Sequence, residues 1–130
     1  MLAKHCYDHE DVAACRTRMD RHLQAWRELM ADGPPGLAAF EPVFFNRLVI
    51  ELAFCFIDWP IGAAPDPFTE VRVLATSLTC DGRVAVDRTI RWCPEQTVLG
   101  YRAGEPIAVR EAEFLALERA FLRELEGRLG

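Results

Sequence analysis

The side chains of this 130-residue chain with the clearest potential for chemistry are arginines and carboxylates at helical spacing. Arg47 and Glu51 are four residues apart, so they would lie on the same face of a helix, and Asp58 extends that stripe. A guanidinium and a carboxylate in a mostly apolar pocket could bind a small anion or exchange protons, because burial would raise the carboxylate pKa while the arginine opposed that rise. The alternative is an ion pair on a solvated edge of the helix, which contributes about 0.3 to 0.5 kcal/mol.

Two more arginines, Arg72 and Arg91, fall in segments whose sequence predicts paired β-strands. The predicted register places them directly opposite each other, and like charges in that position destabilise a sheet by a few tenths to about 1 kcal/mol. An acidic group such as Glu70, or a bound anion, should therefore lie between them. The candidate ligand-binding residues are Arg47, Glu51, Arg72 and Arg91.

Three potential metal ligands lie close together near the N-terminus: His5, Cys6 and His9. Zinc accepts imidazole and thiolate ligands, but a structural zinc site needs four of them. The nearby Asp8 and Cys15 have no established ligand spacing, so a solvated terminal segment is the favoured alternative. We therefore expect no metal ion and no cofactor.

The chain has five cysteines, an odd number without a C-x-x-C pair, which indicates free thiols rather than a disulfide framework. Cys55 would behave as a small apolar side chain unless a cation lay beside it. His22 falls on the apolar face of a predicted helix, where a histidine hydrogen-bonded to a neighbour is favoured over a catalytic one.

The composition excludes several classes of function. The chain is 51% hydrophobic and 27% charged, as in ordinary globular domains, and its formal net charge is -5. An acidic chain without a basic tail is unsuited to bind a phosphate backbone. The uninterrupted apolar run at residues 52–57 is too short to span a bilayer, and the N-terminus lacks the apolar region of a secretory signal. We therefore expect a cytoplasmic protein with neither a nucleic-acid nor a membrane partner.

Three helices are predicted from apolar residues at helical spacing. The first begins after Asp8, follows an apolar stripe over residues 12–30 and ends at the Gly-Pro-Pro-Gly turn of residues 33–36. The second, at residues 40–59, is apolar on nearly all sides, so we expect a central helix that the rest of the domain covers. The third starts near residue 111, and its core stripe is Phe114, Leu117, Phe121 and Leu125.

The middle of the chain predicts strands. Residues 69–79 and 84–92 alternate apolar and polar side chains around Asp81-Gly82, a strong hairpin signal, and residues 97–102 and 107–109 predict two further strands. The expected fold is α+β: two N-terminal helices, an antiparallel three- to four-stranded meander sheet, and a C-terminal helix packed on one face. The chain reads as a single domain over residues 1–130.

Several segments carry a resemblance to known sequences. From residue 44 to the C-terminus the chain resembles a group of small bacterial proteins, of actinobacterial type, that have no assigned activity. The similarity leaves the first helix unmatched and departs from the pattern at Arg110, where a Thr or Ser cap is expected before the last helix. It implies a fold but no catalytic residues. The segments that carry it are residues 44–52, 69–74, 87–99, 104–107 and 111–115.

Two functional hypotheses follow. The favoured one is a non-enzymatic domain that forms a homodimer through apolar surface of the central helix or of the outer sheet face, where Leu74, Leu78 and Ala85 would lie. The alternative is a binding protein or enzyme whose arginines and Glu51 line a pocket for a small anionic molecule. Enzyme activity stays open, because the sequence contains no nucleophile–base pair and no Gly-rich phosphate loop.

Overall fold

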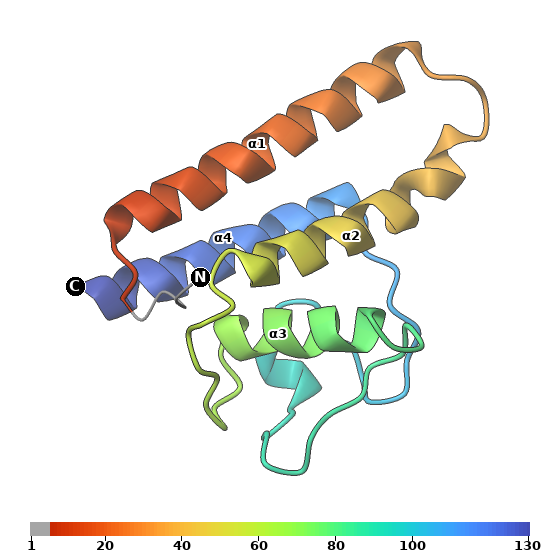
Figure 1. Cartoon of the computed structure of the whole chain (residues 1–130). Coiled ribbons are helices and arrows are strands. Elements are labelled where there is room, and N and C mark those ends of the chain that lie inside the picture. The colour runs from red at the N-terminus through yellow and green to blue at the C-terminus, as the bar shows by residue number, and fades with distance from the viewer. Residues whose placement is uncertain (1–5) are drawn as a thin grey trace.

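The computed structural model describes residues 6–130, and every regular element in that range is a helix (Figure 1). The predicted α+β fold is therefore wrong: within residues 6–130 the β-pairing is limited to one isolated bridge between Arg83 and Pro106. The elements are α1 (His9–Asp32), the 3₁₀ turn η1 (Leu37–Phe40), α2 (Glu41–Phe54), α3 (Pro67–Leu78), the 3₁₀ turn η2 (Pro94–Gln96) and α4 (Glu111–Leu129).

The helices form three layers. α2 and α4 run side by side in the same direction, α1 packs on one side of this pair, and α3 packs on the other, with α1 and α3 running the opposite way (Figure 1). The long segment 79–110 passes along the outer side of α3 before it leads into α4 (Figure 1). The core therefore lies on both sides of the α2–α4 layer.

Helix α3 occupies the residues that were predicted to form the first strand. Its start is defined locally, since the Asp66 side chain accepts a hydrogen bond from the Thr69 N–H at 2.8 Å and Pro67 stands at the first helical position. α2, α4 and the segment 79–110 cover most of α3: eight of its twelve residues are buried, and its open edge is a narrow strip with the half-buried Arg72 and the exposed Thr76. The buried residues of α3 include an alternating series, and its β-branched residues suit a strand as well as a largely buried helix; the series is Val71, Val73, Ala75 and Ser77. This alternation explains the wrong prediction.

The Asp81-Gly82 pair is not a hairpin turn. Gly82 has a left-handed backbone (φ 79°), and its N–H donates to the Ser77 carbonyl at 3.0 Å, so the pair closes the C-terminal end of α3. Val84 then pairs with the chain near residue 105, through hydrogen bonds to Glu105 and Gly104. Glycine after aspartate suits both structures, because each requires a positive φ.

The helix predicted at residues 40–59 is present in part, but it is not the covered central helix that we expected. α2 ends at Phe54, and its outer face exposes Val43 (54%) and Phe54 (65%). In the described range there is no sheet to cover that face, and the segment that would have formed it covers α3 instead. The most enclosed helix of the fold is α3.

The amphipathic helices at the two ends of the chain are confirmed. The Asp8 carboxylate caps α1, and the predicted stripe of α1 is buried from Val12 to Trp26 apart from the half-buried His22. The last part of that stripe was predicted wrongly, because Leu29 and Met30 are exposed. All four residues predicted for the core stripe of α4 are fully buried. The apolar outer face that was predicted for the sheet is absent from the described range. Leu74 is fully buried in α3, and Leu78 is half-buried.

Two polar side chains attach the segment 79–110 to the helices. The buried Glu70 carboxylate accepts the N–H groups of Val98 (2.7 Å) and Leu99 (3.0 Å). Burial raises the pKa of Glu70, and these two donors oppose that rise. The Asn46 amide of α2 pairs in the same way with the extended chain that enters α4: it donates to the Ile107 carbonyl and accepts the Val109 N–H, each at 3.0 Å.

The start of α4 is capped from α2, which accounts for the absence of a Thr or Ser at position 110. The Glu41 carboxylate accepts the Glu111 N–H at 2.8 Å and the Arg110 guanidinium at 3.0 Å. A carboxylate at a helix N-terminus is favoured by the helix dipole. The cap is thus supplied by a residue seventy positions away in the sequence.

Candidate functional site

Two of the four candidate ligand-binding residues border the same hollow. Arg47 and Glu51 lie one turn apart on α2 and line a surface hollow of about 420 Å³ beside α1. Arg18 of α1, which the sequence analysis did not select, lines it with them, and Ile50 and Phe54 supply apolar wall. The hollow therefore combines two guanidinium groups, one carboxylate and apolar surface.

The Glu51 carboxylate pairs across the helices rather than along α2. Its Oε2 atom lies 2.9 Å from Nε2 of His22 on α1, and among the described residues no ion pair joins it to Arg47. His22 is half-buried, so the prediction of a histidine hydrogen-bonded to a neighbour is confirmed. Arg47 keeps its guanidinium at the exposed rim of the hollow.

The other two candidate residues lie elsewhere. Arg72 lines a groove of about 180 Å³ between α2 and α3, and its Nη1 donates to the Trp59 carbonyl at 2.9 Å. Burial lowers the pKa of Arg72. Arg91 is exposed in the segment 79–110, where its backbone N–H donates to the Ala63 carbonyl at 3.1 Å. The ladder that would have placed these arginines opposite each other is absent from the described residues, so Glu70 is not held between them and serves the backbone of residues 98 and 99 instead.

A ridge of apolar side chains separates the two hollows. Ile50 and Phe54 border both the hollow beside α1 and the groove beside α3. Along the outer face of the α2 region the spacing alternates between four and three residues, which is the spacing of a helix face that packs on another helix. We call this face the α2 seam; its members are Val43, Arg47, Ile50, Phe54 and Ile57.

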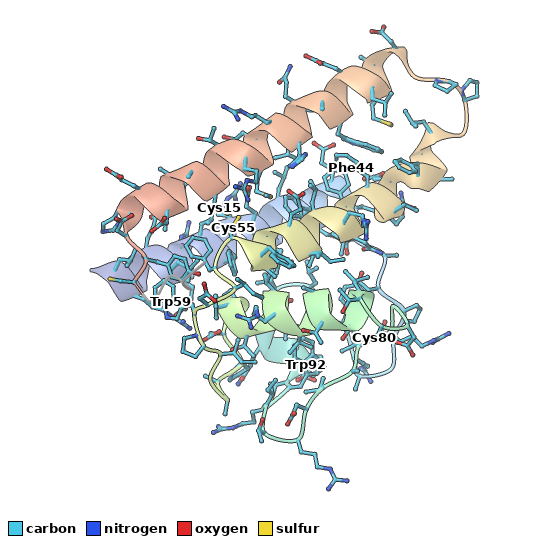
Figure 2. The ribbon with its side chains drawn as sticks, in the orientation of Figure 1. Cys15, Phe44, Cys55, Trp59, Cys80 and Trp92 are labelled. Carbon is cyan, nitrogen blue, oxygen red and sulfur yellow. The ribbon has the colours of Figure 1, made fainter. Side chains whose placement is uncertain are left out.

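Two thiols meet between α1 and the end of α2. Figure 2 shows Cys15 and Cys55 side by side, and the interaction between the two thiols lowers the pKa of Cys55 and raises the pKa of Cys15. Nη1 of Arg18 lies 4.0 Å from Sγ of Cys55, and this cation lowers the pKa of Cys55 further. The condition under which Cys55 would be more than a small apolar side chain, a cation beside it, is therefore met.

Arg18 and the thiol pair are the features that sequence reasoning missed. A signal for Arg18 existed, since it lies three residues after Cys15 and thus on nearly the same face of α1. The contact between Cys15 and Cys55 had no signal, because it depends on how two helices dock.

Glu118 of α4 is a buried carboxylate next to this region. It is 8% exposed, and its Oε2 atom has no hydrogen-bond partner among residues 6–130. Burial, together with the nearby Asp20, raises the pKa of Glu118 to about 7. It borders a separate hollow of about 310 Å³ between α1 and α4, alongside Arg16 and Arg119.

Neither a metal-binding cluster nor a membrane-spanning helix is found among the described residues. Within residues 6–130 no three His, Cys, Asp or Glu side chains are placed to hold a metal ion, and the predicted group at the N-terminus includes His5, which lies outside the described residues. In the same range no helix is both long enough and apolar enough to cross a bilayer.

Comparison with models of known families, with curated proteins and with solved structures finds no match to this chain. The resemblance to small bacterial proteins therefore stays a prediction, and function has to be argued from the geometry described above.

Proposed function

We propose that this protein is a non-enzymatic interaction domain of the cytoplasm that works as a homodimer, with the α2 seam at the dimer interface. The observation that carries the proposal is the exposure of large apolar side chains along α2 and the turn that follows it: Val43 is 54%, Phe54 65% and Ile57 43% exposed. Apolar side chains gathered on one face in this way are typical of interaction sites.

The shape of the surface favours a second copy of the chain as the partner. A two-fold interface uses the same patch on both subunits, so that patch must fit itself. Here the ridge of Ile50 and Phe54 has a groove on each side. Two copies related by a two-fold axis could each place the ridge in a groove of the other, as helices do when ridges pack into grooves.

The charges of Arg47 in the seam and of Glu51 beside it agree with a two-fold pairing. Arg47 and Glu51 are one turn apart on α2 and border the same hollow. In an antiparallel pairing of two α2 helices, Arg47 of one copy can lie opposite Glu51 of the second copy, and the same contact repeats across the axis. A parallel pairing would place like charges together.

The test is sedimentation velocity over a range of protein concentrations. The wild-type chain should sediment as a dimer, and Phe54→Lys should weaken the dimer by at least about tenfold, because it buries a charge at the interface. A lysine in the last turn of α2 agrees with the helix dipole, so folding should be retained. Val98→Lys is the matched control, since Val98 is also an exposed apolar residue (38%) but lies in the segment 79–110. A monomeric wild-type chain, or equal effects of the two variants, would contradict the proposal.

A second candidate function, binding of a small anion, is favoured by the presence of Arg18 beside Arg47 in one hollow. Isothermal titration with a short aliphatic dicarboxylate tests it. Arg47→Ala should abolish the binding heat, whereas Arg72→Ala should preserve it, because Arg72 lies on the other side of the ridge. The absence of binding heat with the wild-type chain would remove this candidate.

A further inference from the structure

The contact between Cys15 and Cys55 joins two helices at a point that solvent can reach. Cys15 is 3% exposed on the inner face of α1, whereas Cys55 is half-buried directly after α2. Glu51 and Phe54, which are neighbours of Cys55, line the hollow beside α1. Arg18 lines it too, and its guanidinium contacts the Cys55 sulfur. A small molecule in that hollow is therefore close to the thiol of Cys55.

The groups around Cys55 favour its thiolate. On α1, the Cys15 thiol and the Arg18 guanidinium lower the pKa of Cys55, while burial and Glu51 on α2 oppose them; the net effect is a lowered pKa. On the α4 side, Glu118 acts on Cys15 and raises its pKa. The two thiols thus differ: Cys55 is the one that more easily loses its proton, and Cys15 is the one that keeps it.

We propose that Cys55 and Cys15 form a peroxide-reactive thiol pair, in which Cys55 is oxidised first by a small hydroperoxide and Cys15 then closes a disulfide between α1 and the end of α2. The placement of one half-exposed and one buried thiol in contact, with a guanidinium at the half-exposed one, supports this order.

The chemistry balances with a hydroperoxide as the only oxidant. The Cys55 thiolate attacks the outer oxygen of the O–O bond, which forms a sulfenic acid and releases water or an alcohol after proton transfer to the leaving oxygen. The Cys15 sulfur then attacks the Cys55 sulfur; the S–O bond breaks, the S–S bond forms, and water leaves with the Cys15 proton. In total two thiols lose two electrons and two protons to one hydroperoxide. An external dithiol reverses the change by thiol–disulfide exchange.

The test uses the reduced wild-type chain, hydrogen peroxide as the probe, and peptide mass spectrometry after alkylation at successive times. The expected result is a Cys15–Cys55 disulfide that dithiothreitol removes. Cys80, an exposed thiol of the same chain, serves as internal control, and Cys55 should be oxidised at least about tenfold faster than Cys80. Oxidation of Cys80 before Cys55 would overturn the proposal.

A pair of variants tests the order of the two steps. In Cys15→Ser the sulfenic acid on Cys55 should persist and be trapped by a dimedone reagent, whereas Cys80→Ser should form the disulfide as the wild-type chain does. Loss of Cys55 oxidation in a folded Cys15→Ser chain, judged by circular dichroism, would overturn the assigned order. The measurement on the wild-type chain needs no variant, so it decides even where a substitution prevents folding. The proposed dimer would fill the hollow beside Cys55 with the ridge of the second copy, so the oxidation is measured at a protein concentration at which sedimentation velocity shows the monomer. The readout is the covalent state of each thiol and not the mass of the assembly, so failure of this proposal and failure of the dimer are distinguished.

Discussion

The guanidinium of Arg18 lies 4.0 Å from the sulfur of Cys55, although the two residues are 37 positions apart in the sequence. This contact connects the two findings about the surface beside α1, because Arg18 also lines the hollow that Arg47 and Glu51 border. One arginine of α1 therefore lowers the pKa of a thiol and also adds positive charge to the hollow.

Arg18→Ala should raise the pKa of Cys55, because the substitution removes a cation that stabilises the thiolate. The expected result is slower alkylation of Cys55 by iodoacetamide at neutral pH, by a factor of up to about ten. Arg21→Ala on the exposed side of α1 is the control and should leave the rate unchanged. Equal rates in the wild-type chain and Arg18→Ala would show that the guanidinium does not act on the thiol.

The buried Glu118 should make the stability of the protein fall as the pH rises. A carboxyl group whose pKa is raised on folding binds its proton more tightly in the folded chain. Its stabilisation is therefore complete below the ordinary value of 4.5 and is lost as the pH increases to about 7. Glu118→Gln should reduce this dependence and increase the free energy of unfolding above pH 7 by about 1 to 2 kcal/mol.

Urea denaturation at several pH values measures the Glu118 effect. Glu95→Gln is the control, since Glu95 is exposed in the turn η2 and should leave the pH profile as it is. A profile that is the same for the wild-type chain and Glu118→Gln would contradict the prediction.

Asp66→Ala should destabilise the protein through the start of α3. The Asp66 carboxylate caps the Thr69 N–H at 2.8 Å and also accepts the Arg128 guanidinium of α4 at 2.8 Å. Loss of a cap costs about 1 kcal/mol in the free energy of unfolding, to which the lost ion pair adds. Asp66→Asn separates the two contributions, because an amide oxygen retains the cap without the charge. Urea denaturation should therefore rank the wild-type chain above Asp66→Asn and Asp66→Ala last.

Asn46→Ala should release the chain that enters α4. The amide of Asn46 satisfies the Ile107 carbonyl and the Val109 N–H, and both of those residues are buried. Buried backbone groups without a partner cost about 1 to 3 kcal/mol each, so the free energy of unfolding should fall by about 2 kcal/mol or more.

Hydrogen exchange distinguishes this local release from general destabilisation. The Val109 amide should exchange much faster in Asn46→Ala than in a variant of similar stability such as Asp66→Ala. Exchange at the same rate in both variants would mean that the Asn46 side chain does not hold this segment.

The sequence predictions were accurate where a helix has a broad solvent-exposed face. α1 and α4 each bury one stripe and expose the rest, so their apolar spacing predicted them correctly. α3 has only a narrow open strip at Arg72 and Thr76, and its buried series Val71, Val73, Ala75 and Ser77 was taken for the alternation of a strand. The Asp81-Gly82 turn strengthened that interpretation, because a glycine with a left-handed backbone occurs both in hairpin turns and at the C-terminal ends of helices.

The candidate site shows the same division. Arg47 and Glu51 border one hollow because residues four positions apart on a helix lie on the same face. This relationship is visible in the local sequence. Arg72 was assigned to the same site through a sheet that the described residues do not form, and it lies beyond the ridge of Ile50 and Phe54. Their separation was decided by the packing of α3 against α2.

By itself, the sequence determined the end helices, their caps and the apolar composition of α2, because these depend on residues within one or two turns of each other. Only the tertiary structure decided which helix is most enclosed, which face of α2 stays exposed, and that Cys15 lies beside Cys55. Those features depend on contacts between residues tens of positions apart, such as Glu41 with Glu111 and Arg18 with Cys55. Such contacts leave no periodic pattern in a single sequence, because they are selected by the fit of whole helices in the core.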